Sequence, residues 1–195
     1  MKKIVLVLIV FTALAFTKRA NVNTTSVLIN AESQLLINGK TNINSFKCEF
    51  NISQIKNPIP LNYEVINDKI VFTNTKLILD SYCFDCGSKG INQDFRALLK
   101  SNEYPQIQLR LKEIRKSKTN PLIVTALLEL HIAGKSKSYY TPLSLDETDG
   151  ICVSGLLKLN ITDFDLKAPK KALGLIVVSD AIEIDFLMNF REGKF

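Results

Sequence analysis

The sequence predicts a single all-β domain, an antiparallel lipocalin-like β-barrel of about eight strands with one short helix. Beyond residue 25, apolar residues recur at every second position, and clusters of turn-forming residues separate these runs. Only one segment shows the spacing of a helix instead. One-sided strands joined by short turns favour antiparallel pairing, and closing the sheet into a barrel removes its exposed edges. A chain of 195 residues that is 46% hydrophobic can fill one such domain.

The N-terminus differs from the rest of the chain. Lys2-Lys3 precede a nearly unbroken apolar run at 4–16, and Ala13-Leu14-Ala15 matches a small-x-small cleavage site. The run is shorter than the ~20 residues that a membrane-spanning helix needs. We therefore expect residues 1–20 to be a secretory signal peptide and 21–195 to form a periplasmic or secreted domain. A buried N-terminal helix and an uncleaved anchor are the alternatives.

Six runs alternate clearly between an apolar and a polar face. They cover residues 46–51, 77–79, 107–112, 124–132, 153–161 and 182–190. Turn residues gather at Asn38-Gly39, 117–121, 134–136 and 146–150. Each run predicts a strand with one face toward the core and one toward water.

The helix is expected at Asn92 to Lys100. Phe95, Leu98 and Leu99 would share one face, and Asn92 is the expected N-cap. Pro105 pushes the residue before it toward an extended conformation, so the helix ends ahead of it. We expect this helix to border one end of the barrel.

The apolar faces of the strands define a candidate ligand-binding wall. Parity turns all of them toward the barrel axis. They are Phe46, Phe50, Leu77, Leu79, Leu109, Leu128, Leu130, Leu157, Leu159, Ile184 and Phe186. The interior of such a barrel is either filled by side chains or holds one small ligand, and the sequence leaves both open. A ligand between these residues would be a lipid tail rather than a sugar or a nucleotide.

The charge is mild. The formal net charge of +6, from 25 basic and 19 acidic residues, falls to +4 without Lys2 and Lys3, which argues against a nucleic-acid partner. The basic residues Lys112, Arg115 and Lys116 continue into a hairpin with Lys118. They favour solubility or, alternatively, a transient contact with anionic lipid headgroups.

The four cysteines leave several pairings open. In an oxidising compartment Cys48, Cys83, Cys86 and Cys152 could form up to two disulfides, in three combinations. Cys83 and Cys86 have the C-x-x-C spacing of redox sites, but such sites need a helix directly after the motif in a βαβ unit. With one histidine, His131, and scattered carboxylates, we expect no catalytic centre, no metal and no cofactor.

Several segments together resemble one family. They are Ile37-Asn38-Gly39-Lys40-Thr41 with Phe46, Asn92-Gln93-Asp94-Phe95, Tyr104-Pro105-Gln106-Ile107, the hairpin 130–137, Ile161-Thr162-Asp163-Phe164 and Asp180-Ala181-Ile182. In this order they resemble the YceI-like family, a lipocalin-like polyisoprenoid-binding domain of exported bacterial proteins, over residues 26–190. The resemblance implies a non-catalytic binding protein whose barrel takes an isoprenoid or fatty chain. The other possibility is a filled-core structural or stress-related interaction domain.

The resemblance also bears on the cysteines. Cys48 and Cys86 fit a cysteine-containing branch of the family, and the turn at Asp85-Cys86-Gly87 can reach across to a strand. We therefore predict a Cys48–Cys86 disulfide, with Cys83 and Cys152 either paired or free.

Overall fold

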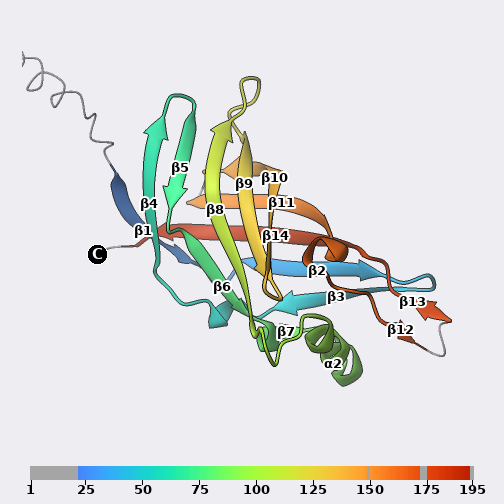
Figure 1. Ribbon diagram of the computed structural model, residues 1–195. Coiled ribbons are helices and arrows are strands. Elements are labelled where there is room, and N and C mark those ends of the chain that lie inside the picture. Colours follow the sequence, from blue (N-terminus) through green and yellow to red (C-terminus); the bar gives the residue numbers. More distant parts are fainter. Residues whose placement is uncertain (1–21, 149, 172–174, 194–195) are drawn as a thin grey trace, which may run out of the picture.

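The computed structural model describes residues 22–148, 150–171 and 175–193 (Figure 1). The expected signal peptide lies outside these residues. Among the residues described, no helix is long and apolar enough to span a membrane. The dominant element is one large antiparallel sheet, so the all-β prediction is confirmed.

Eight strands of this sheet close into a ring. Around the ring they are β1 (Asn23–Ile29), β4 (Ile59–Ile66), β5 (Lys69–Thr73), β8 (Gln106–Lys116), β9 (Ile123–Ile132), β10 (Lys135–Asp146), β11 (Ile151–Asn160) and β14 (Ala181–Glu192). The ring closes where β1 pairs with β14, with Ile29 opposite Phe190. The predicted antiparallel barrel of about eight strands is therefore present.

Two long strands change partners along their length. β8 pairs with β5 near Arg115, but near Leu109 it pairs with β6 (Lys76–Asp80). Likewise, β14 pairs with β1 near Phe190, but near Ile184 it pairs with β2 (Gln34–Lys40). β3 (Ser45–Phe50) and β7 (Phe84–Asp85) continue the sheet beyond β2. The wall is thus built from β1 and β5 toward one end of the barrel and from β2 and β6 toward the other (Figure 1).

The helix α2 spans Lys89–Leu98 and begins three residues before the predicted start. Ser88 is its N-cap, since the Ser88 hydroxyl accepts a hydrogen bond from the backbone N–H of Ile91. The predicted cap, Asn92, lies inside the helix. Its side chain binds β7 instead, accepting from the backbone N–H of Cys86 at 2.6 Å and donating to Asp85 at 3.0 Å. The prediction of Asn92 as the cap was therefore wrong.

The turn expected at Asn38-Gly39 is also absent. Both residues lie in β2, opposite Lys47 and Phe46. The chain turns at 41–44 instead, where Thr41 donates its N–H to the carbonyl of Asn44. A β-carbon at Gly39 would overlap the Phe46 ring, so this glycine makes room for an aromatic side chain rather than for a turn.

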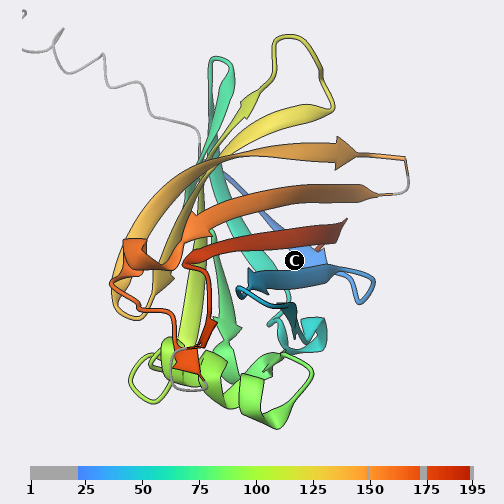
Figure 2. The ribbon, with the colours of Figure 1, turned by 90° about the vertical axis from the view of Figure 1, so that its right-hand side faces the viewer.

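Short elements complete the described chain. They are the 3-10 turns η2 (Ile52–Gln54), η3 (Ser81–Cys83) and η4 (Ile161–Phe164), and the strand pair β12 (Lys170–Lys171) and β13 (Ile176–Val177). In both ribbon views α2 lies at one end of the barrel, and the β4–β5 and β8–β9 hairpins project at the other (Figures 1 and 2). The barrel therefore has one covered end and one end formed by hairpin turns.

Candidate ligand-binding cavity

The barrel encloses a cavity of about 380 Å³. Ligand sites of small molecules typically occupy about 300–1,000 Å³, so this space is large enough for one. Among the residues described, aliphatic and aromatic side chains form nearly all of its wall, and the polar residues on the wall are Thr75 and Ser179. The interior is hollow and apolar.

The structure places all but one of the sequence-derived wall residues on this cavity. They are Phe46, Leu77, Leu79, Leu109, Leu128, Leu130, Leu157, Leu159, Ile184 and Phe186. Each lies on the inward face of its strand, as alternation requires. That they contact a ligand remains a prediction.

Phe50 is the exception. It is 2% exposed but does not line the cavity. It is the last residue of β3, directly opposite Phe84, and the two ring centroids are 5.0 Å apart. Phe84 in turn packs on Phe95 of α2 at 5.2 Å, and these two rings face the cavity. Phe50 is therefore buried against Phe84 and does not reach the cavity.

The covered end of the cavity is a floor made by three segments. Phe84 of β7, Phe95, Leu98 and Leu99 from the helix segment, and Ile161, Phe164 and Leu166 at η4 all line it. Most of these residues are buried, and α2 is amphipathic, so its apolar face packs onto the barrel. The expected position of the helix at one end is confirmed.

Ion pairs hold η4 against the start of β10. The Tyr139 hydroxyl donates to Asp163 at 2.9 Å, and Lys137 lies 3.4 Å from the same carboxylate. Burial, and then the bond to Asp163, raise the pKa of Tyr139. Lys135 lies 2.7 Å from Asp165, and this hydrogen bond lowers the pKa of Asp165. These contacts keep Asp163 and Asp165 on the outside of the barrel.

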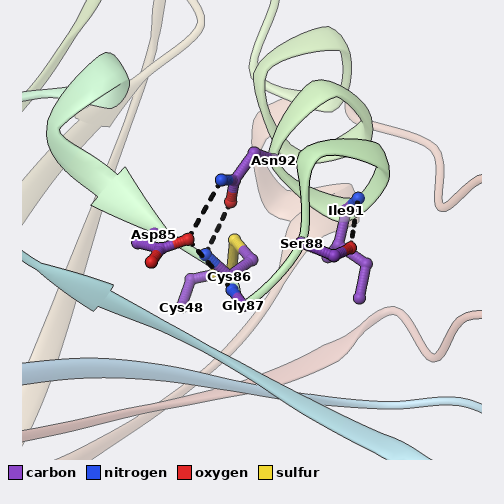
Figure 3. Close-up of a disulfide and its surroundings, with 7 residues drawn as sticks. All are labelled: Cys48, Asp85, Cys86, Gly87, Ser88, Ile91 and Asn92. Carbon is purple, nitrogen blue, oxygen red and sulfur yellow. Dashed lines mark hydrogen bonds between the residues drawn. A yellow bond between two sulfur atoms is a disulfide. The ribbon is translucent and has the colours of Figure 1, made fainter.

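A disulfide between Cys48 and Cys86 ties the floor to the wall (Figure 3). It joins β3 to the segment that leads from β7 into α2, where Asn92 bonds to both Asp85 and Cys86. The predicted pairing is confirmed, and Cys83 and Cys152 are free. Because Cys86 is bonded to Cys48, the C-x-x-C pair is not formed. Burial, and then the charge of Asp80, raise the pKa of the Cys83 thiol, which disfavours its thiolate.

The other end of the cavity is open. Ile151 lines the wall there and is 51% exposed, whereas the residues of the floor are mostly buried. Ile151 begins β11, directly after the β10–β11 turn, and lies opposite Phe190 of β14. The cavity mouth is therefore at the end where the hairpins turn.

A sequence model of the YceI-like domain matches residues 73–190. The chain belongs to the YceI-like family. The match covers the strands from β6 to β11, most of β14 and the whole cavity floor. The segments near residue 40 that also suggested the resemblance lie outside it. No curated protein matches the sequence.

Solved structures agree on the fold. BcnA of Burkholderia cenocepacia has a TM-score of 0.61 at 17% identity, over 83% of this chain and 98% of that chain. A polyisoprenoid binding domain from Saccharophagus degradans, implicated in plant cell wall breakdown, has a TM-score of 0.61 at 14% identity, over 87% and 99%. The YceI protein of Campylobacter jejuni has a TM-score of 0.51 at 17% identity, over 64% and 74%.

His131 and Glu183 of this YceI-like domain lie on the outward faces of their strands. His131 Nδ1 lies 2.9 Å from the Ser136 hydroxyl of the neighbouring strand, and Glu183 lies 3.4 Å from Lys158. Among the described residues, no three His, Cys, Asp or Glu side chains gather as a metal site would require.

Proposed function

We propose that this YceI-like protein binds an apolar chain, a polyisoprenoid or a fatty lipid, inside its barrel without changing it chemically. The hollow apolar cavity carries this proposal. The fold that it shares with a polyisoprenoid binding domain agrees with it.

The chemistry of the wall selects the class of ligand. A sugar or a nucleotide would leave its hydrogen bonds to water and find almost no polar partner on the wall, which is costly. A hydrocarbon chain has no hydrogen bonds to water to lose, and its burial contributes about 0.8 kcal/mol for each methylene. Leu109, Leu128 and Ile184 offer such contacts from three different strands. The cavity therefore suits a hydrocarbon chain best.

We further propose that the protein works in the periplasm or outside the cell. The apolar N-terminal run and its cleavage pattern support export. The Cys48–Cys86 disulfide is consistent with an oxidising compartment. In such a place a lipid-binding barrel would shield a hydrocarbon chain from water.

The alternative is a structural or stress-related interaction domain with a filled core. The cavity favours lipid binding over it, because about 380 Å³ of apolar space between the side chains removes packing contacts that a purely structural domain would keep. An apolar ligand would restore these contacts.

Extraction with organic solvent tests the proposal. We expect mass spectrometry of the extract from purified protein to detect a stoichiometric prenyl or fatty compound. The Leu157→Trp variant should fold but carry no lipid. Leu157 lines the cavity beside its strand partner Ile184, and the larger indole ring would fill the space that the chain needs. Leu156→Trp is the matched control, since Leu156 is 42% exposed on the outer face. Extracts without lipid, or equal lipid in both variants, would contradict the proposal.

A further inference from the structure

Three hairpins surround the open mouth of the cavity. The β4–β5 turn lies next to β8, with Lys69 opposite Arg115. The β8–β9 turn lies next to β10, where the N–H of Leu145 donates to the carbonyl of Leu122 at 2.8 Å. The β10–β11 turn follows, and its last residue borders Ile151, which lines the cavity. The hairpin tips of β4–β5 and β8–β9 project together in both views (Figures 1 and 2).

Each hairpin exposes large aliphatic side chains to water. Val65 at the β4–β5 tip is 62% exposed, Leu122 at the β8–β9 tip is 56% exposed, and Ile151 is 51% exposed. Ile66 and Ile123 beside them are also exposed. Single exposed apolar residues are ordinary, but a group of them around the mouth of an apolar cavity marks an interaction surface. We call these five residues the rim.

The charge beside the rim is unevenly distributed. The β8–β9 hairpin carries Arg115, Lys116 and Lys118, and no acidic residue occurs between Ile114 and Leu128. Among the described residues, no carboxylate pairs with Lys116 or Lys118, whereas Arg115 is paired with Glu113. Among the described residues, the other two tips carry acidic residues instead, Asp68 at the β4–β5 turn and Asp146 and Glu147 at the β10–β11 turn. The β8–β9 tip therefore combines exposed aliphatic groups with unpaired positive charge.

We propose that the rim docks on an anionic lipid bilayer, with the β8–β9 tip making the first contact. Leu122 would enter the boundary between headgroups and acyl chains, while Lys116 and Lys118 meet anionic headgroups. This proposal rests on the proposed lipid-binding function. A hydrocarbon chain then passes from the bilayer into the cavity beside Ile151 without crossing water, which a mouth facing the solvent does not allow.

Tryptophan fluorescence tests the docking, because the sequence contains no Trp. Leu122→Trp places one probe on the rim. Ile43→Trp places the control probe at the opposite end, where Ile43 is 70% exposed in the β2–β3 turn. Each variant of the full chain is mixed with vesicles of phosphatidylcholine with phosphatidylglycerol, with and without brominated acyl chains. The quenching is local to each probe, so binding by residues 1–21 cannot imitate it.

We expect the emission of the Leu122→Trp probe to shift to the blue on addition of vesicles and to be quenched by brominated chains. The Ile43→Trp probe should show neither change. An unchanged probe at 122, or equal quenching of both probes, overturns the proposal. Lys116→Gln and Lys118→Gln should each weaken binding to anionic vesicles by about fivefold. Equal binding to neutral vesicles would overturn the part assigned to the lysines.

The two experiments test the docking surface and the lipid-binding function independently. If the probe at 122 stays in water while the extract contains a stoichiometric lipid, the docking surface is wrong and the proposed function stands. If the probe inserts but no lipid is extracted, the barrel is a membrane-binding domain without a ligand, and the proposed function fails.

Discussion

The ring of Phe186 occupies the space that a side chain at Gly155 would fill. The two residues lie directly opposite each other on β14 and β11, and a β-carbon at Gly155 would be 2.7 Å from Cζ of Phe186. Phe186 also lines the cavity. Glycine at this position therefore lets the ring lie back against the wall and leaves room for a ligand.

Replacing Gly155 by alanine should push the Phe186 ring, and Leu143 Cδ2 at the same distance, into the cavity. If the displaced side chains exclude two methylene groups, at about 0.8 kcal/mol each, lipid affinity should fall about fifteenfold. Titration with a fluorescent fatty or prenyl probe measures this. Gly90→Ala is the control, because a β-carbon there meets nothing within 4 Å. Equal affinity for Gly155→Ala and the parent would show that the ring does not limit the cavity.

An acidic residue on the cavity wall should destabilise the barrel. Leu128→Asp buries an unpaired carboxylate on β9, so the free energy of unfolding should fall by more than about 3 kcal/mol. The neighbour Glu129 faces outward and lies 3.3 Å from Arg110, so Glu129→Gln should cost less than about 1 kcal/mol. Urea unfolding of both variants compares them. Similar losses would mean that the alternation along β9 has been misassigned.

Removing the disulfide should loosen the cavity floor. It closes a loop of 38 residues, so the chain-entropy estimate of its contribution is about 4 kcal/mol, with less often observed. The double variant Cys48→Ser/Cys86→Ser should lose up to this amount in urea and exchange its bound lipid faster. Cys83→Ser removes a free thiol and serves as the control. If the double variant were as stable as this control, the disulfide would not stabilise the contact between β3 and the cavity floor.

Glu113 should make stability depend on acid pH. It is buried on the outer face of β8, and its hydrogen bonds from Arg115 and then Lys69 lower its pKa. A folded-state pKa below the unfolded value of about 4.3 stabilises the folded protein above that pH. This stability is lost as the pH falls through the folded-state pKa. Glu113→Gln should therefore flatten the fall of the urea midpoint between about pH 5 and pH 3.

The exposed Glu103→Gln is the matched control for that pH series. Among the described residues no basic side chain pairs with Glu103, so this variant should keep the acid dependence of the parent. An unchanged slope in Glu113→Gln would place the acid-sensitive group elsewhere.

Alternation along the chain predicted most of the cavity wall, since inward and outward positions follow directly from a period of two. The same signal was present but overlooked in β4, where Ile59 and Leu61 alternate with Pro60 and Asn62 and reach the cavity. Phe164 and Leu166 at η4 gave no such signal, because a short 3-10 turn and the chain after it have no repeating face.

Tertiary contacts explain the remaining differences. Asn is a common helix N-cap, but the Asn92 side chain forms hydrogen bonds with Asp85 of β7 and with Cys86 directly after it. No local sequence pattern predicts that short strand. Parity placed Phe50 inward correctly, yet it could not show that Phe84 would cover it. Nor can parity decide whether opposite walls touch, so the choice between a hollow and a filled barrel needed the three-dimensional structure.

The position of a bound chain tests the central claim most directly. A polyprenyl chain carrying a photoreactive diazirine is bound to the protein, irradiated, and its adducts are mapped by peptide sequencing. The cavity predicts adducts on inward residues such as Leu109, Leu157 and Ile184, and loss of these adducts when unlabelled chain competes. Adducts confined to outward residues such as Leu156 and Ile78 would contradict a chain held inside the barrel.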